Sequence, residues 1–339
     1  MLTLDAARPS AGRDHQMDIE SLHMRREASR RALRRRRRRA AGLLAAILAV
    51  AVAIAVVLSG SGGAGRSPPR PAHTALATGH GAPVPGVASK RGGGVRTGRP
   101  GGVPVPILMY HVIAAPPAGA PFPGLYVEPL QFAAQMRSLA RAGWTAVTLD
   151  ELAAYWREGV SLPSGKPIVL SFDNGYHSQF AQALPVLKRL GWVGNENIQL
   201  TGLPPSQGGL SESEVRGLVA AGWELDTQGT NHADLITLDA LQLHEQIAGT
   251  RAILRRRYHV PVNWFCYPSG HYDATVVAAV RAAGYAGSTT VVPGWAHRSD
   301  DPFRLHRLRV LGGTSPAALL AQIAATHDDP PAPDSYNGT

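Results

Sequence analysis

Polar side chains follow several apolar, strand-like runs of the sequence at the point where each run ends. The run "PIVLSF" leads into Asp173 and Asn174, and "WEL" leads into Asp226 and Gln228, with His232 four residues further on. A carboxylate in such a position can accept a proton from water, and an imidazole can bind a metal ion or donate a proton. Asn174 and Gln228 are neutral amides, which suit sugar hydroxyls better than metal ions. These residue types predict either a hydrolytic centre or a polar binding site.

Two further runs end in residues that could contact a substrate. "VPILMY" ends in Tyr110 and is followed by His111, and "NWFCY" ends in Tyr267 and is followed by Pro268. A lone histidine is most often a packing residue, but the recurrence of polar residues at several strand ends favours one shared site. Cys266 is the single cysteine of the chain and cannot form an internal disulfide, so it is predicted to be a packed apolar residue.

The elements that position these residues alternate between strands and helices. About seven strands are predicted from the runs "VPILMY", "TAVTL", "PIVLSF", "NIQL", "WELDTQ", "NWFCY" and "YAGSTT", and amphipathic stretches separate them. One helix should open at Pro129 and another at Ser211, whose spacing to Glu214 fits a capping box. A longer helix over 237–258 should turn Leu241 toward the core. Repeated strand–helix units favour an α/β fold with a parallel sheet or barrel, whose functional residues gather at the carboxyl ends of the strands.

The positive charge of the chain is concentrated in its N-terminal segment, residues 1–39. Arg25 to Arg39 contains ten arginines and one acidic residue, a net charge of +9, whereas the whole 339-residue chain carries +10. The remaining sequence is therefore nearly neutral, at about +1. A basic groove is not expected, so no nucleic-acid partner is predicted.

An apolar run of nineteen residues, 40–58, follows the arginines directly. It contains no charge and reaches the length of a membrane-spanning helix. The alternative is a cleaved signal peptide, but the apolar part of a signal peptide is usually only about 7 to 15 residues long, and no clear cleavage site follows here. Arginines before the run keep that side cytoplasmic. We therefore predict a single-pass anchor in the cell membrane, with the N-terminus in the cytoplasm and the main domain outside.

Sequence rich in Gly and Pro flanks a predicted globular domain, residues 104–327. Residues 59–103 are predicted to be a disordered linker and residues 328–339 a disordered tail, because neither segment can bury enough apolar surface to offset the entropy of ordering. The apolar content of 44% is ample for one core in the domain between them.

A series of motifs within this domain resembles the polysaccharide deacetylases of the NodB-homology type, also called carbohydrate esterase family four. The motifs are "LMYH", "QMRSLARAGWTAVTLDEL", "PIVLSFDNGY", "ALPVLKRLGW", "NHADL", "PVNWFCYPSGHYD" and "AAGYAGSTT", in the family's order over nearly all of 104–310. The resemblance implies a distorted (β/α) barrel of about seven strands. It also implies a metal-dependent hydrolase that removes acetyl groups from N-acetylhexosamine polymers, with acetylated glycan as the partner.

The resemblance assigns roles to the polar residues, and the sequence departs from two of them. In the family, two adjacent aspartates supply a general base and a metal ligand, and an H-x-x-x-H motif supplies two further ligands for zinc or a related divalent ion. Asp173 matches the base, and His232 matches the last ligand, or an acid where no metal binds. Asn174 and Gln228 replace the other two ligands. Asp226 points to the same side of its strand as Gln228 and is a candidate substitute ligand.

The remaining assignments concern substrate binding. The third family motif corresponds to Tyr267 and Pro268, which would help to hold the acetyl group and its developing oxyanion. Tyr110 and His111 are expected to contact the glycan as well. For the late arginines in "HRLRV" two alternatives stay open, pairing with the catalytic carboxylate or exposure at the surface.

Two functions are compatible with these residues. The first is a membrane-anchored hydrolase facing the cell wall, with Asp173 as base and a divalent ion held by His232, Asp226, Asn174 and Gln228. The second is a non-catalytic glycan-binding pseudoenzyme of the same fold, in which the two amides bond sugar hydroxyls and aromatic rings stack on the sugars. Metal binding and release of acetate distinguish them.

Overall fold

The computed structural model describes residues 95–201, 208–327 and 330–338, all within a compact unit from Gly81 to Thr339. The predicted segments 1–39 and 40–58, and the linker as far as residue 94, lie outside the described residues. Within the described part of the chain, no helix is long and apolar enough to cross a membrane.

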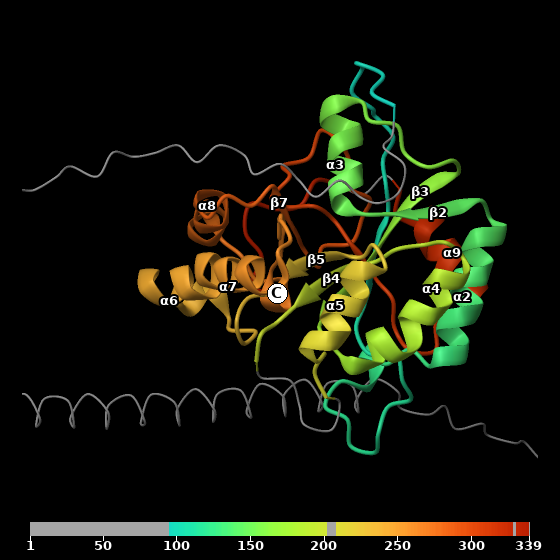
Figure 1. Ribbon diagram of the computed structural model, residues 1–339, viewed down its shortest axis with the longest axis horizontal. Helices are drawn as coiled ribbons and strands as arrows, with labels where there is room; N and C mark the ends of the chain where they lie inside the picture. The colour runs from blue at the N-terminus through green and yellow to red at the C-terminus, as the bar shows by residue number, and fades with distance from the viewer. Residues whose placement is uncertain (1–94, 202–207, 328–329, 339) are drawn as a thin grey trace, which may run out of the picture. The chain divides into compact units, whose positions relative to one another are not determined.

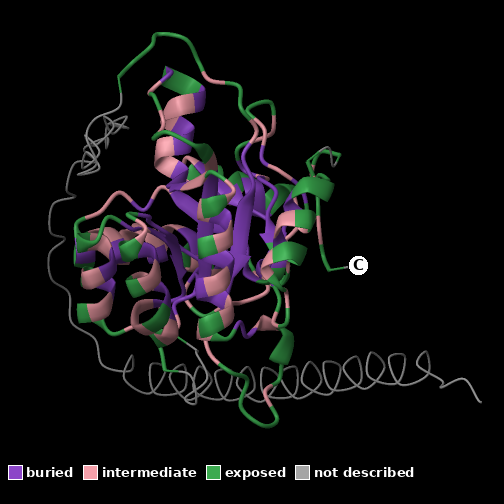
Figure 2. Ribbon diagram, turned by 90° about the vertical axis from the view of Figure 1, so that its right-hand side faces the viewer, coloured by how far each residue is buried: buried purple, intermediate pink, exposed green. Residues whose placement is uncertain are grey.

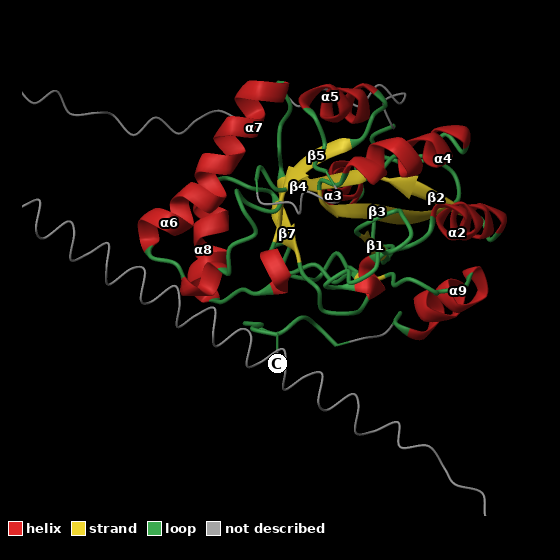
Figure 3. Ribbon diagram, turned by 90° about the horizontal axis from the view of Figure 1, so that it is seen from below, coloured by secondary structure: helices red, strands yellow, loops and turns green. Residues whose placement is uncertain are grey.

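One curled sheet of eight parallel strands forms the centre of the domain, and the helices lie around it (Figures 1 and 3). The strand order is β7-β6-β5-β4-β3-β1-β8, and β2 pairs with the first part of β3. The strands are β1 (Ile107–Tyr110), β2 (Trp144–Val147), β3 (Lys166–Asn174), β4 (Asn195–Ile198), β5 (Glu224–Thr227), β6 (Trp264–Cys266), β7 (Gly287–Thr289) and β8 (Leu308–Arg309).

Helices connect most of these strands, as parallel pairing requires. They are α2 (Pro129–Arg141), α3 (Leu149–Glu158), α4 (Leu184–Arg189), α5 (Glu212–Ala220), α6 (Ala240–His244), α7 (Thr250–Tyr258), α8 (Ala274–Ala282) and α9 (Pro316–Ala325). A π-helical turn precedes α4 at Gln179–Ala183, and another joins α6 to α7 at Glu245–Gly249. Short 3₁₀ turns occur at Pro123–Leu125, Leu235–Thr237 and Pro268–Gly270.

The segment that ends in β8 brings the two edges of the sheet together. It first runs beside β7, where Ser288 N–H donates to Pro302 O at 2.8 Å and Thr290 N–H donates to Leu305 O at 2.9 Å. It then pairs with β1 at the other edge. The strands thus form a curled half-barrel, in keeping with the distorted barrel predicted from the sequence. The short strand β8 lies within "HRLRV", where the sequence indicates a strand near the end of the domain in addition to the seven runs.

Local sequence signals explain where several helices begin. Helix α2 starts at Pro129 as predicted, and the predicted capping box of Ser211 and Glu214 opens α5. The prediction for Leu241 is wrong, because this side chain is 69% exposed. Helix α6 begins only one residue earlier, and its first turn buries Leu243 instead.

Strand alternation separates an apolar layer from a polar interior. In β3, Leu170 and Phe172 pack into a core cluster with residues of the surrounding helices, whereas Ser171 and Asp173 point to the opposite side, inside the curl of the sheet. Figure 2 shows that buried residues are concentrated on the strands. The inward-facing polar residues of β3 to β6 therefore meet in a water-poor interior.

Both Gly/Pro-rich flanks contain segments that dock on the domain, which corrects the prediction of disorder for residues 95–103 and 330–338. Gly101 N–H donates to Tyr155 O at 2.9 Å, and Trp156 Nε1 donates to Val103 O at 3.0 Å. At the other end, Tyr336 exchanges two backbone hydrogen bonds with Tyr272, each of 2.9 Å. Backbone pairing of this kind leaves no trace in composition, which is why the sequence predicted flexible segments.

Candidate active site

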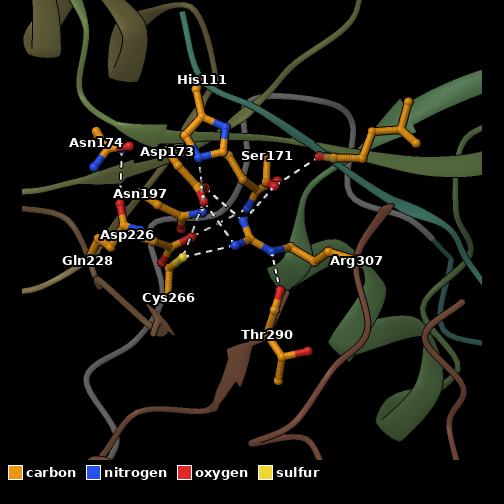
Figure 4. Close-up of polar contacts among 12 residues, drawn as sticks. His111, Ser171, Asp173, Asn174, Asn197, Asp226, Gln228, Cys266, Thr290 and Arg307 are labelled. Atoms are coloured by element: carbon orange, nitrogen blue, oxygen red, sulfur yellow. Dashed lines mark hydrogen bonds and ion pairs between the residues drawn. The ribbon is translucent and has the colours of Figure 1, made fainter. Parts of the chain in front are cut away.

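A buried ion pair between Asp173 and Arg307 forms the centre of the candidate site (Figure 4). Asp173 ends β3, and Arg307 lies on the segment that closes the sheet. The guanidinium donates two parallel hydrogen bonds, Nη1 to Asp173 Oδ1 at 2.7 Å and Nη2 to Asp173 Oδ2 at 2.9 Å. Burial alone would raise the pKa of Asp173, but the charge and hydrogen bonds of Arg307 outweigh it and bring the pKa to about 2. Asp173 is therefore ionised at neutral pH.

All the guanidinium nitrogens of Arg307 have protein partners. Beside the carboxylate, they donate to Thr290 O at 2.7 Å, Ser171 Oγ at 3.1 Å and Cys266 Sγ at 3.2 Å. The side chain is fully buried, so these bonds are needed to offset the loss of hydration. Of the two alternatives for the late arginines, pairing with Asp173 holds for Arg307.

Two neighbours complete the shell of the carboxylate. Asn197 of β4 donates from Nδ2 to Asp173 Oδ1 at 2.8 Å. Cys266 of β6 lies with its sulfur 3.5 Å from Asp173 Oδ2, and burial raises the pKa of its thiol, so it stays protonated. The prediction of a packed cysteine is confirmed, with the addition that it touches the ion pair. Asn197 was missed from the sequence, although it follows the rule that inward-facing residues of neighbouring strands meet.

His111 approaches the other side of the carboxylate. Its Nε2 lies 4.0 Å from Asp173 Oδ2, too far for a direct hydrogen bond. Burial lowers the pKa of His111 to about 4, against the opposing effect of Asp173, so the imidazole is neutral at pH 7. A single water or substrate hydroxyl placed at this gap could contact both groups.

A chain of amides lies beside this pair. The backbone N–H of Asn174 donates to Gln228 Oε1 at 3.1 Å, and the side-chain Nδ2 of Asn174 donates to Gln199 Oε1 at 2.8 Å. Gln228 Nε2 lies 3.3 Å from His232 Nε2. The structure therefore brings Asn174, Gln228 and His232 together as the sequence predicted. It adds Gln199, which follows β4 and which the sequence analysis did not single out.

Two members of this hydrogen-bonded group of amides and histidine adopt left-handed backbone conformations that are uncommon for non-glycine residues. Asn174 has φ of 78° and His232 has φ of 56°. Such conformations usually cost free energy and cluster at functional sites, although Asn tolerates them better than most residues. Gly175 continues the turn with φ of 86°, and a Cβ there would lie 2.8 Å from Ile198 Cγ1. The turn after β3 is therefore tightly specified.

Asp226 does not join these residues. Its Oδ1 accepts from Trp264 N–H at 2.9 Å and its Oδ2 accepts from Asn195 Nδ2 at 3.4 Å. Burial raises the pKa of Asp226 and of the neighbouring Glu224, with which it shares a hydrogen bond, so the pair holds a proton. Trp264 and Glu224 stand at the amino ends of their strands, whereas His232 lies beyond a carboxyl end. The carboxylate of Asp226 is thus engaged at the wrong end of the strand to replace a lost ligand.

The donor set does not fit the divalent ion that the family resemblance implies. Zinc sites in proteins use imidazole, thiolate and carboxylate ligands, and here only His232 of the expected triad is of that kind. Among residues 95–201, 208–327 and 330–338, no three His, Cys, Asp or Glu side chains form a metal-binding group. The expectation of an ion held by His232, Asp226, Asn174 and Gln228 is therefore not supported by the geometry.

Three of the four predicted substrate contacts prove to be packing residues. Tyr110 is fully buried, donates to Gln135 Oε1 at 3.0 Å and stacks on Phe172. Tyr267 is equally buried, and its hydroxyl donates to Phe303 O at 2.9 Å while its N–H donates to Thr289 O at 3.3 Å. Pro268 is buried as well. Only His111 of this group reaches the site. The prediction failed for the others because aromatic residues at strand ends can also pack in the core, and residue type alone does not distinguish the two roles.

Comparisons with known proteins agree with the fold and the motif order. Residues 162–288 match the family model described as polysaccharide deacetylase. Bacillus subtilis YxkH, whose name assigns it provisionally to the polysaccharide deacetylases, is 28% identical over 220 residues, covering 65% of this chain and 76% of that protein.

Solved structures show the same architecture. The polysaccharide deacetylase BC0361 from Bacillus cereus superimposes with a TM-score of 0.58 at 26% identity, over 66% of this chain and 69% of that one. The Streptococcus pyogenes deacetylase PplD, solved in complex with acetate, superimposes with a TM-score of 0.60 at 24% identity, over 66% of this chain and 99% of that one.

The fold and these relatives together indicate a hydrolase of the polysaccharide deacetylase type, which cleaves carbon–nitrogen bonds other than peptide bonds. The resemblance to polysaccharide deacetylases of the NodB-homology type, with a degenerate metal-binding motif, is thereby confirmed.

Proposed function

We propose that this protein removes acetyl groups from an amino-sugar polymer at the outer side of the cell membrane. The observation that carries the proposal is the ionised carboxylate of Asp173, only 1% exposed, at the carboxyl end of a strand in a polysaccharide deacetylase-type domain. A buried charge is costly even when paired, and such groups are concentrated at functional sites.

The residues around Asp173 suit hydrolysis of an acetamido group. His111 Nε2 and Asp173 Oδ2, 4.0 Å apart, can both contact an attacking water. The neutral imidazole takes the proton as the water oxygen bonds to the acetyl carbon, and the carboxylate stabilises the imidazolium that forms. The proton then passes to the nitrogen of the sugar as the carbon–nitrogen bond breaks. The products are acetate and a free amino sugar.

A groove beside the mouth supports a polymeric substrate. It has a volume of about 390 Å³ and is lined by the loops that follow β1 and β8 and by the first turn of α2, among them Pro123, Tyr126, Gln131 and Gly312. Burial, and to a smaller degree the nearby negative charge of Asp173, raise the pKa of Tyr176 to about 12. Tyr126 of the groove pairs with Val112, the residue that follows His111. A glycan chain can therefore run from the carboxylate into this groove, as extended ligands do in pre-formed clefts.

The proposal is tested by acetate release from acetylated wall glycans. His111→Gln keeps the size and polarity of the side chain but removes the proton acceptor, so we expect release to fall about 100-fold or more. Glu212→Gln, at an ion pair on the surface of α5, is the matched control and should leave the rate unchanged. Equal rates for the wild type and His111→Gln, or no release by any of them, would contradict the proposal.

One observation favours a second candidate, a glycan-binding module without catalysis. Asn174 and Gln228 stand where metal ligands are expected, and amides are well suited to sugar hydroxyls. This candidate predicts that the wild-type protein sediments with insoluble acetylated glycan and releases no acetate. Release of acetate by the wild type, lost in His111→Gln, removes it.

The location at the cell membrane rests on the apolar run 40–58 and the arginines before it. We expect the full-length protein to remain in the membrane fraction after a high-salt wash, and its C-terminal domain to be cleaved by protease added outside the cell. A domain protected from external protease would rule out this orientation.

A further inference from the structure

Hydrogen bonds made by the side chain of Gln228 close the position where the family resemblance expects a divalent ion. Asn174, Gln228 and His232 stand at the three ligand positions of the motif. They are joined to one another through the bonds of 3.1 Å and 3.3 Å that Gln228 makes on its two sides. The question is whether these groups are free to turn toward an ion.

The orientation of Gln228 is fixed by the backbone. The N–H of Asn174 can only donate, so the side-chain atom 3.1 Å from it must be the oxygen of Gln228. The amide nitrogen of Gln228 consequently faces His232 Nε2 and donates to it, so His232 Nε2 is the acceptor. The lone pair that would bind an ion is therefore already engaged.

The side chain of Asn174 is held on its other side. Its Nδ2 donates to Gln199 Oε1 at 2.8 Å, and Gln199 Nε2 in turn donates to Thr201 O at 2.7 Å. Asn174, Gln199 and Gln228 are all buried. Releasing any of these amides to coordinate an ion would leave a buried polar group unpaired, which is unfavourable.

Neither of the neighbouring aspartates, Asp173 and Asp226, can replace the missing carboxylate ligand. Both oxygens of Asp173 accept hydrogen bonds from Arg307, whose positive charge also repels a cation. Asp226 bonds Trp264 and Asn195 at the other end of its strand. The charge that attracts a dication to such a site is therefore missing.

We infer that this site works without a divalent ion. Gln199, Asn174, Gln228 and His232, joined by side-chain hydrogen bonds and by the backbone N–H of Asn174 and here called the amide chain, fill the place of the ion. The inference rests on the proposed function only for the assumption that the substrate binds at this mouth.

Titration of zinc and cobalt into the purified full-length protein tests the inference. The wild type should show no uptake that depends on His232. The variant Asn174→Asp/Gln228→His restores the carboxylate and the imidazole and should take up a single equivalent, with the intense visible absorption of tetrahedral cobalt. Adding His232→Ala to this variant should abolish the uptake, and Asp226→Ala in the wild type should change nothing.

Two outcomes would overturn the inference. The first is stoichiometric uptake by the wild type that is lost in His232→Ala. The second is the absence of uptake by a folded double variant, since the two amides would then not be what closes the site. Thermal unfolding of each variant checks the fold. If the double variant does not fold, the single variant Gln228→His, which leaves the turn at Asn174 unchanged, replaces it and should bind zinc more tightly than the wild type does. Because the readout is metal uptake, failure of this inference and failure of the proposed hydrolysis are distinguishable.

Discussion

At the residue scale, the site depends on how the charge of Asp173 is balanced. Arg307 neutralises it with two parallel hydrogen bonds and is itself fully buried. The pair keeps Asp173 ionised, and it keeps the carboxylate in one orientation facing His111. A carboxylate with a pKa of about 2 is a weak base by itself, so its main part in catalysis is to stabilise positive charge that develops on the neighbouring imidazole.

The pair predicts a large effect of removing the arginine. In Arg307→Met the charge of Asp173 stays buried without its partner, so the free energy of unfolding should fall by about 3–5 kcal/mol. Urea unfolding measures the change. The matched control is Arg216→Met, whose ion pair with Glu212 is half exposed, so its loss should lower the free energy of unfolding much less than the loss of Arg307. A similar loss of unfolding free energy in the two variants would show that burial does not increase the contribution of the Asp173–Arg307 pair to stability.

Glu196 of β4 predicts a dependence of stability on pH. It lies between Phe172 and Leu225 in the sheet, fully buried, and neither carboxyl oxygen has a hydrogen-bond partner. Burial raises its pKa well above the usual value of 4.5, and the negative charges of Asp173 and Asp226 raise it further. The folded protein therefore holds a proton that the unfolded chain releases above pH 4.5.

The sign follows from this difference in bound protons. Above pH 4.5, and up to the raised pKa of Glu196, the stability of the wild type should fall as pH rises, by at most about 1.4 kcal/mol per pH unit for this one group. Glu196→Gln, which cannot ionise, should lose this part of the slope and be more stable than the wild type at neutral pH. Urea unfolding from pH 5 to 8 measures both, and parallel curves for the two proteins would refute the assignment.

At the element scale, the C-terminal segment 330–338 ties down the loop that follows β6. Tyr272 and Tyr336 exchange backbone hydrogen bonds, Tyr272 OH donates to Pro333 O at 2.8 Å, and Arg304 pairs with Asp334. The same loop carries His271, which bonds Asp234 at 3.0 Å on the segment after His232. The segment thus supports one side of the candidate site.

Deleting residues 330–339 should loosen this loop without unfolding the domain. The amide of Tyr272 loses its acceptor, so its hydrogen exchange should become faster, whereas amides in the middle of β3 should be unaffected. Asp334→Ala is the matched control, because Asp334 is 99% exposed and its removal keeps the backbone pairing. Unchanged exchange at Tyr272 would mean that the segment does not restrain the loop.

The sequence predicted elements better than contacts. The capping box of Ser211 and the start of α2 are local signals and were found where expected, and the observed strands overlap the predicted runs. The roles of Tyr110 and Asp226 could not be predicted, because they depend on which neighbouring strand each side chain meets. Alternation within a strand gives the side on which a residue lies, but not whether it bonds toward the amino or the carboxyl end.

At the scale of the whole molecule, the fold places polar residues from four strands and from the closing segment in one enclosed interior. The family resemblance anticipated this architecture from the order of short motifs, since several of them, such as "LMYH" and "PIVLSFDNGY", mark the end of a strand. It did not anticipate how two substitutions change the chemistry. Asn174 and Gln228 stand at ligand positions but form hydrogen bonds in place of metal coordination. Only the structure shows these bonds, which connect them to each other, to Gln199 and to His232.

The central claim is that Asp173 and His111 carry out hydrolysis at this site without a divalent ion. The most direct measurement is the rate of acetate release from acetylated wall glycan by the full-length protein before and after exhaustive treatment with a chelator. The account predicts release at the same rate in both samples. Release that stops on chelation and returns with added zinc would contradict it.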